Sequence, residues 1–483
     1  MSVTKRHGNP LVLALGGIFF AIFAIFAIFA IFAAVPQAAA QGGEPSSFAI
    51  RGARVVAVSG PILEEATVVV SRGMIVAVGK DAAIPSEAWI IDGKGLTVYP
   101  GLIDGLTDVA LLSAGVAPGR LAAEISPAHA PQPAASGPED RPGATPWRSA
   151  ADEATLSDKR IESWREAGFT TVVAAPKDGI FPGQAAVLNL AGDRPGGMVV
   201  KGAVAVPLSL NPVGSFRSFP GSLMGVLGYV HQVWLDTEWY KQASAGYAKN
   251  PRGQARPAYD RSEAVLQQAL DSKALVLIPA NNSVQIRRAL ALAERWKVRA
   301  VLYGGQMGYE TAGEIAAKKI PVLVNLQWPE KSKDADPDEP PTLRVLRFRD
   351  RAPSAPAALA RAGVKFAFYS GAISAPKDIL KAARKAVDAG LAEDAALRAL
   401  TLSPAEIFGV ADRLGSIEAG KIANLIVADG SLFAEKTKIK IVFVDGRKFE
   451  IRETPKPAEP TKNGPTGEKP AEEFALPMAG GAQ

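Results

Sequence analysis

The sequence predicts an α/β protein, a TIM-like (β/α)8 barrel fused to a small β-sandwich that both ends of the mature chain would build. Three observations predict it. In the middle of the chain, β-rich and helix-periodic runs alternate, and strand starts recur about 22–25 residues apart, as right-handed crossovers between parallel strands require. Short strands and turns without helices occur near both ends of the chain. The length of 483 residues leaves room for both parts. An open doubly wound sheet is the alternative to the barrel.

The β-sandwich is predicted from strand-like runs at both ends of the mature chain. Each set alone would form only a marginal piece of sheet, so we expect the two sets to pair. Asp445-Gly446 suits the two-residue turn of a hairpin between the last two runs. The predicted strands are 48–58, 67–70, 74–78, 89–92, 424–428, 439–444 and 447–451.

The barrel is predicted from six strands and the helices between them, with helix-end signals in support. Pro376 begins one helix and Gly390 ends it, while Ser403-Pro404-Ala405-Glu406 has the order of a capping box with Ser403 as the cap, and Gly409 ends that helix. Proline-rich or polar stretches interrupt the barrel at 113–150, 240–261 and 329–342. The predicted strands are 98–103, 170–174, 275–278, 300–303, 322–326 and 365–369, and the earlier helices are 158–167, 283–296, 311–318 and 355–362.

The first 40 residues are typical of an export signal. A positive start precedes an apolar run at 11–35, and Ala38-Ala39-Ala40 offers a cleavage site. The run is also long enough to span a bilayer, so a retained anchor is the alternative. In either case we expect the folded part outside the cytoplasm, in the periplasm or the extracellular space. The predicted organisation is 1–40 signal, 48–97 first part of the β-sandwich, 98–411 barrel, 412–453 second part of the β-sandwich and 454–483 a disordered proline-rich tail.

Composition excludes several classes of function. The formal net charge is only +6, which is too small and too dispersed to indicate nucleic-acid binding. The chain has no cysteine, which excludes disulfides, thiolate zinc sites and cysteine nucleophiles. It has three histidines, one of them in the signal segment, so most histidine-rich metal chemistry is excluded too.

Two groups of motifs resemble the amidohydrolase superfamily in its imidazolonepropionase-like branch. The first is Gly-Met-Ile-Val-Ala-Val-Gly at 73–79 with Val-Tyr-Pro-Gly-Leu-Ile-Asp at 98–104, and the second is Arg-Leu-Gly-Ser-Ile-Glu-Ala-Gly-Lys-Ile-Ala-Asn-Leu-Ile-Val at 413–427. The resemblance covers about residues 48–452. It implies a metal-bearing barrel that hydrolyses C–N bonds with zinc or another divalent ion, which activates water.

The positions at which the resemblance places metal ligands hold other residues. The His-x-His after the first barrel strand would fall on Gly105, Leu106 and Thr107, and the histidine of strand five on Pro279. The histidine of strand six would fall near Gly304 or Gly305, and the aspartate of strand eight near Gly371. Without a metal, water activation loses on the order of 12 kcal/mol. We therefore expect no metal site and no cofactor.

Polar residues near these positions would line a vestigial pocket. Asp104 and Asp108 lie four residues apart and could bind a cation or act as an acid–base pair, although Asp104 is better explained as a hydrogen-bonding residue of the structural motif at 98–104. His129 lies in a proline-rich loop, and His231 lies in a helical run, where it is expected to be a helix-face residue. No nucleophile-elbow sequence is present. The pocket residues are Asp104, Thr107, Asp108, Asn281, Gln306 and Ser370.

The functional hypothesis is therefore an exported amidohydrolase-like protein without the family's metal ligands, a pseudoenzyme that binds a ligand or serves as a partner subunit. Its expected partners are a small molecule, an active amidohydrolase relative or a second copy of the chain, and not nucleic acid. The alternative is a hydrolase acting on non-peptide C–N bonds with a relocated or absent metal.

Overall fold

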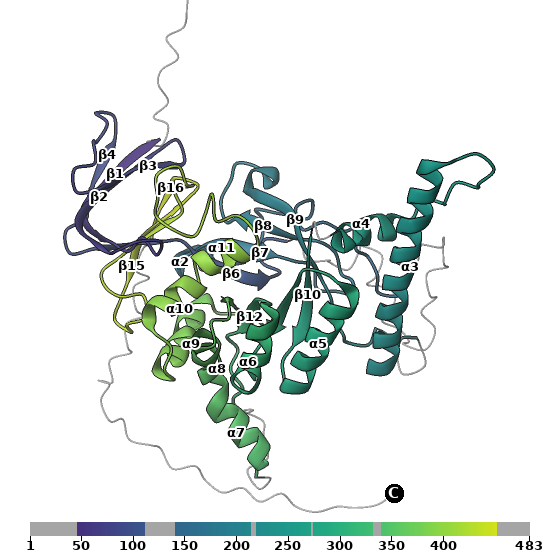
Figure 1. Cartoon of the computed structure of the whole chain (residues 1–483). Coiled ribbons are helices and arrows are strands. Elements are labelled where there is room, and N and C mark those ends of the chain that lie inside the picture. The colour runs from purple at the N-terminus through teal and green to yellow at the C-terminus, as the bar shows by residue number, and fades with distance from the viewer. Residues whose placement is uncertain (1–45, 112–140, 214–218, 272–273, 332–339, 452–483) are drawn as a thin grey trace, which may run out of the picture.

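The computed structural model describes residues 46–111, 141–213, 219–271, 274–331 and 340–451. Strands of the described chain form two eight-stranded sheets (Figure 1). One sheet combines the two ends of the described chain, and the other is a nearly closed barrel with helices around it. The predicted α/β class, with a TIM-like barrel and a separate β domain, is confirmed. None of the helices in these ranges is both long enough and apolar enough to cross a bilayer; residues 11–35 lie outside the described part.

The sheet of the β domain joins strands that are more than 300 residues apart in sequence. β14 pairs antiparallel with β5, so that Val427 lies opposite Val98. The hairpin of β15 and β16 follows, turning at Asp445-Gly446 as predicted. The strands are β1 (Ser47–Val55), β2 (Leu63–Ser71), β3 (Met74–Gly79), β4 (Trp89–Asp92), β5 (Thr97–Pro100), β14 (Leu425–Ala428), β15 (Ile439–Val444) and β16 (Arg447–Glu450).

The barrel sheet runs from β13 in order down to β6, and its two end strands meet. The backbone N–H of Ser370, just after β13, donates to the Asp104 side chain on β6 at 2.9 Å. A Cβ placed on Gly105 would lie 2.7 Å from the carbonyl oxygen of Phe368, so glycine permits this close approach. The strands are β6 (Leu102–Thr107), β7 (Phe169–Ala174), β8 (Ala185–Asn189), β9 (Val199–Pro207), β10 (Leu275–Ala280), β11 (Ala300–Gly304), β12 (Val322–Asn325) and β13 (Phe366–Tyr369).

One barrel strand runs against the other seven. β8 is antiparallel to both β7 and β9. No α-helix separates these three strands, and only the short 3-10 helix Pro195–Met198 lies between β8 and β9. The alternating pattern in the sequence predicted neither β8 nor β9, because strands joined without a crossover helix lack that rhythm. The described helices are α2 (Arg160–Glu166), α3 (Leu223–Lys249), α4 (Arg261–Leu270), α5 (Ser283–Trp296), α6 (Gly308–Lys318), α7 (Leu343–Arg351), α8 (Ala355–Arg361), α9 (Pro376–Asp388), α10 (Glu393–Ala399) and α11 (Leu402–Ile407).

Two predictions of helix ends and interruptions are wrong. Ser403 lies inside α11, whose cap position is Thr401, and no side chain caps that end. α3 continues to Lys249 through the first part of the predicted interruption at 240–261. Pro376 does begin α9, and Gly390 and Gly409 follow α9 and α11 with positive φ angles, as left-handed helix ends require.

The barrel encloses its own apolar core, which is separate from the core under the helices. Ile103, Val187, Leu277, Val301 and Leu323 are buried in the interior cluster. Their positions on the strands alternate with outward-facing residues, as the two-residue period of a strand requires. The segment of α11 and the turn after it, with Ile407 and Phe408, packs onto the same cluster.

Candidate functional site

The sequence-predicted ligand positions lie at one end of the barrel. β10, β11, β12 and β13 are parallel, with Pro279 opposite Tyr303 and Asn325 opposite Tyr369. Gly304 ends β11 and Gly371 follows β13 by two residues, while Gly105 and Thr107 lie at the end of β6. These positions therefore meet at the carboxyl ends of the strands, which form the face that carries active sites in such barrels.

Apolar and phenolic side chains occupy the inward-facing positions at this rim. Leu106 and Tyr303 pack against the interior core, and Tyr369 belongs to it. The two tyrosine rings meet edge to face, with their centroids 6.5 Å apart, and the Tyr303 hydroxyl donates to the Leu208 carbonyl at 2.8 Å. Burial raises the pKa of both phenols well above its usual range, so both remain protonated at neutral pH.

Neither tyrosine was predicted from the sequence to line the rim. The signal was present: Tyr303 and Tyr369 lie two residues after Val301 and Ala367, which are buried inside the barrel. An alternating strand places residues at this spacing on the same face.

Two of the expected ligand positions are turn glycines held against asparagine side chains. A Cβ on Gly304 would lie 2.2 Å from Asn281 Oδ1, and one on Gly371 would lie 2.2 Å from Asn325 Oδ1. Their φ angles are +115° and +65°. Any side chain at either position would be strained and would displace the asparagine. Asn325, which the sequence analysis did not single out, thus shapes the rim together with Asn281.

Gln306 is tied to the same segment of the rim. Its side-chain amide donates to the carbonyl oxygens of Asn325 at 3.1 Å and Gln327 at 2.6 Å, and only 8% of the residue is exposed. Both of these donor hydrogens are engaged by the backbone. Gln306 therefore fixes the turn after β12 rather than presenting a free amide to a ligand.

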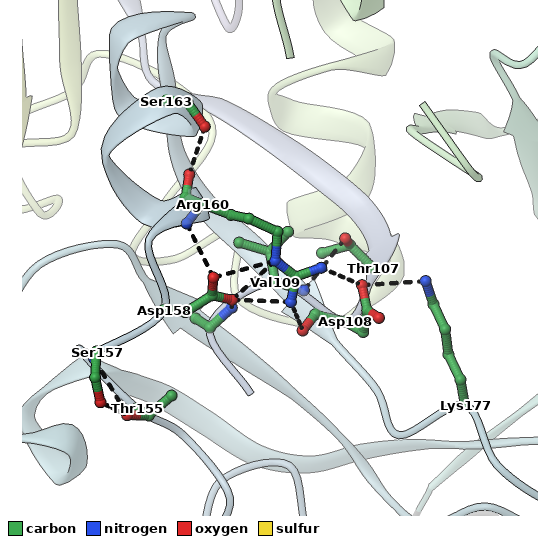
Figure 2. A network of polar contacts seen from close by, with 10 residues as sticks. Thr107, Asp108, Val109, Thr155, Ser157, Asp158, Arg160, Ser163 and Lys177 are labelled. Atoms are coloured by element: carbon green, nitrogen blue, oxygen red, sulfur yellow. Dashed lines mark hydrogen bonds and ion pairs between the residues drawn. The ribbon is translucent and has the colours of Figure 1, made fainter. Parts of the chain in front are cut away.

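A network of charges surrounds Asp108 at the end of β6 (Figure 2). Arg160 Nη1 donates to Asp108 Oδ1 at 2.9 Å, and Arg160 Nη2 donates to the Asp108 carbonyl at 3.0 Å. Lys177, beyond β7, lies 3.1 Å from the same carboxylate oxygen. On its other side the Arg160 guanidinium holds Asp158, whose Oδ2 also accepts the Ala110 N–H at 2.9 Å. The network thus joins the ends of β6 and β7 to the start of α2.

These contacts decide how Asp108 titrates. Partial burial acts to raise the pKa of Asp108, but the Lys177 ammonium and the Arg160 guanidinium outweigh it and hold the pKa below its usual value. Asp158 shows the same balance, with Arg160 as its main partner. Asp108 is therefore an ionised, doubly paired carboxylate at neutral pH, and a weak general base. Thr107 Oγ1 accepts the Val109 N–H at 3.4 Å and supports the same turn.

Asp104 is separated from this network and is buried. It is 1% exposed, and its Oδ1 accepts the N–H of Ser370 at 2.9 Å and of Leu106 at 3.5 Å. Its Oδ2 has no hydrogen-bond partner in the described part of the chain. Burial raises the pKa of Asp104, and its hydrogen bonds only partly oppose this. Asp104 and Asp108 therefore do not share a site; Asp104 closes the barrel between β6 and β13.

Replacing Asp104 with asparagine is expected to change how stability depends on pH. Because burial raises the pKa of Asp104 in the folded state, the wild type loses stability as pH rises from the unfolded value, near 4, through the folded value. Asparagine keeps an acceptor for Ser370 and has no charge. The stability difference in favour of Asp104→Asn should therefore grow between pH 4 and 7 in urea titrations. A difference that is independent of pH would contradict this account.

Within the described ranges the one histidine, His231, is not among the residues that line the rim. His231 is on α3, where its Nε2 lies 2.9 Å from Arg295 Nη2 on α5. His129 lies outside the described residues. Within the described ranges, no three or more histidine, cysteine, aspartate or glutamate side chains are grouped so that they could hold a metal ion.

Comparisons with known proteins relate this architecture to amidohydrolases. The profile of the amidohydrolase family matches residues 263–454. An amidohydrolase from Thermotoga maritima MSB8 superimposes with a TM-score of 0.67 at 24% identity, covering 83% of this chain and 100% of that one. A prolidase crystallised with N-methylphosphonate-L-proline gives 0.50 at 21%, covering 84% and 99%. A Xaa-Pro dipeptidase with bound methionine gives 0.50 at 16%, covering 84% and 100%.

No curated protein matches the chain in sequence. At these identities the structural matches establish the fold, and the profile match covers the second half of the barrel and the later strands of the β domain. The chain therefore has the fold of these amidohydrolases, and residues 263–454 match the amidohydrolase family profile.

Proposed function

We propose that this is an exported, non-hydrolytic amidohydrolase-like protein, a pseudoenzyme whose barrel rim binds a small molecule or a partner subunit. The proposal rests on the side chains that line the barrel rim. Leu106 and Tyr303 pack against the interior core, Tyr369 belongs to it, and Pro279 lies opposite Tyr303 on β10. These side chains are apolar groups or buried protonated phenols. Placement in the imidazolonepropionase-like branch belongs to the same proposal and rests on the motifs at 73–79, 98–104 and 413–427.

The described residues of the rim do not fit a divalent metal site. Such a site needs imidazole or carboxylate groups free to coordinate. Asp108 is already paired with Arg160 and Lys177, and a cation would have to displace both. Asp104 is turned into the seam between β6 and β13. The turn glycines 304 and 371 leave no space for a ligating side chain without moving Asn281 and Asn325.

The rim is nonetheless polar enough to bind a ligand. Asn281 and Lys177 are exposed there, and Asp108 and Asn325 are half-buried. A binding site of a few convergent polar groups over an apolar floor is common at the mouth of a barrel. An amide or carboxylate-bearing small molecule would find a cation in Lys177 and hydrogen-bonding groups in Asn281.

Metal analysis of the purified full chain tests the proposal. We expect less than stoichiometric zinc, manganese and iron after dialysis, and no hydrolysis of dipeptides or cyclic amides above background. Addition of each metal should leave the melting temperature unchanged. A metal that binds only the native state would raise it. Stoichiometric metal that survives dialysis, with hydrolysis lost on chelation, would overturn the proposal and support the alternative of a C–N hydrolase with a relocated metal.

The hypothesis of a partner-subunit role is tested by identifying the proteins that copurify with this chain. A complex with a histidine-bearing amidohydrolase relative, purified from the native host, would support the subunit role. A monomer without companions whose rim binds a small molecule would support the ligand-binding role instead.

A further inference from the structure

A groove with a basic edge lies away from the rim, between α9 and the segment before β15. It encloses about 930 Å³, and six basic but three acidic side chains line it. Lys377, Lys381, Arg384 and Lys385 all come from α9, at spacings that place them along one face of the helix. The other two basic residues, Lys438 and Lys440, flank the start of β15.

The floor of this groove is apolar. Leu380, Ile439 and Ile451 are partly exposed in it, and Leu432 and Phe433 are buried beneath. Arg384 Nη1 donates to the Phe433 carbonyl at 2.6 Å, which fixes the floor to α9. An occupant that fits must therefore be acidic at its edge and apolar at its centre.

The charges of α9 are available to such an occupant. Lys381 pairs with Asp378 at 2.8 Å and Lys385 with Glu330 at 2.6 Å, and all four side chains are at least half exposed. Ion pairs of this kind contribute little to stability and exchange partners readily. Lys377 forms no ion pair within the described part of the chain.

One segment of this chain has the acidic and apolar side chains that an occupant of the groove needs. The last described residue, Ile451, lines the groove, and its N–H donates to the Lys440 carbonyl at 3.0 Å. A further 32 residues, 452–483, follow from this point. They include Ala-Glu-Glu-Phe-Ala-Leu-Pro-Met at 471–478, with two glutamates, no basic residue, and apolar side chains at alternate positions 474, 476 and 478.

We propose that residues 471–478 dock in this groove, with Glu472 and Glu473 against the basic edge and Phe474, Leu476 and Met478 over the apolar floor. About 20 residues connect the segment to Ile451, and a flexible chain of that length has an end-to-end distance of roughly 25 Å. Its effective concentration at the groove is then about millimolar, so even weak intrinsic binding would hold it in place.

Hydrogen exchange on the full chain tests this proposal. Two full-length variants are compared with the wild type: Glu472→Lys/Glu473→Lys/Phe474→Ser in the segment, and Lys381→Glu/Lys385→Glu in the groove. We expect amide exchange of residues 432–440 to be about tenfold faster in each variant than in the wild type. This factor corresponds to an effective concentration of the segment about ten times its dissociation constant for the groove. The matched control, Lys318→Glu on the remote helix α6, should change nothing in these residues.

A zero-length carbodiimide cross-link supplies the second measurement. Glu472 or Glu473 should link to Lys377, Lys381 or Lys385 within one chain, independently of protein concentration, and a free peptide of residues 470–479 should compete. Combining the two charge-reversed variants, with Phe474 retained, should restore protection. Unchanged exchange in the segment variant, or cross-links that appear only between chains, would overturn the proposal. Neither result depends on what the barrel rim binds.

Discussion

Replacing Asn424 with alanine is expected to lower the free energy of unfolding by about 3–5 kcal/mol, which corresponds to three lost hydrogen bonds and their buried partners left unpaired. Asn424 is 6% exposed and lies between the two sheets. Its Nδ2 donates to Thr171 Oγ1 at 3.0 Å and Asn189 Oδ1 at 2.9 Å on barrel strands, and its Oδ1 accepts the Asp445 N–H at 2.7 Å. Urea unfolding of the full chain measures the loss.

Asn281→Ala is the matched control for this prediction. Asn281 is also an asparagine next to a strand end, but its side chain is exposed and it lies at the rim. Its removal should change stability by about 0.5 kcal/mol or less, as is usual for surface positions. If both variants lose the same stability, then Asn424 does not join the β domain to the barrel in the way its contacts indicate.

Replacing Arg160 with alanine is expected to cost about 2–4 kcal/mol at neutral pH. The guanidinium bridges Asp108 and Asp158, and its loss leaves Asp158, only 10% exposed at the side chain, beside Asp108 with no cation between them. Loss of one partner from a buried pair costs about 3–5 kcal/mol. Because the Arg160 side chain is 38% exposed, solvent screening reduces that figure. Thermal and urea unfolding measure the change.

The same variant should lose part of the acid dependence of stability. The pKa values of Asp108 and Asp158 are lowered in the folded state, so their contribution is present above the unfolded value, near 4, and is lost as pH falls through the folded values. Arg160→Ala should therefore be destabilised less at pH 3 than at pH 7. Arg287→Ala, which removes an exposed arginine paired with Glu314, is the control and should show little change at either pH. Equal destabilisation by the two variants would contradict the network.

Local signals in the sequence predicted the fold class and the positions of most elements. Helical and strand periodicity predicted five of the barrel strands in place, because each neighbours a helix along the chain. The sixth, predicted at 98–103, is instead divided between β5 of the β domain and β6 of the barrel. Turn chemistry predicted the hairpin at Asp445-Gly446 and the start of α9 at Pro376. These signals are local: backbone freedom, ring closure of proline and side-chain spacing act within a few residues.

The roles of the predicted site residues depend on their tertiary contacts. Asp104 and Asp108 are four residues apart in sequence, yet one is buried in the seam of the barrel and the other is paired at its rim. Arg160, Lys177 and Asn325 gave no signal, because their roles depend on partners that are distant in the chain. The missed strands β8 and β9 also depend on pairing alone. Long-range contacts set burial and charge environment, and these two properties fix what a side chain does.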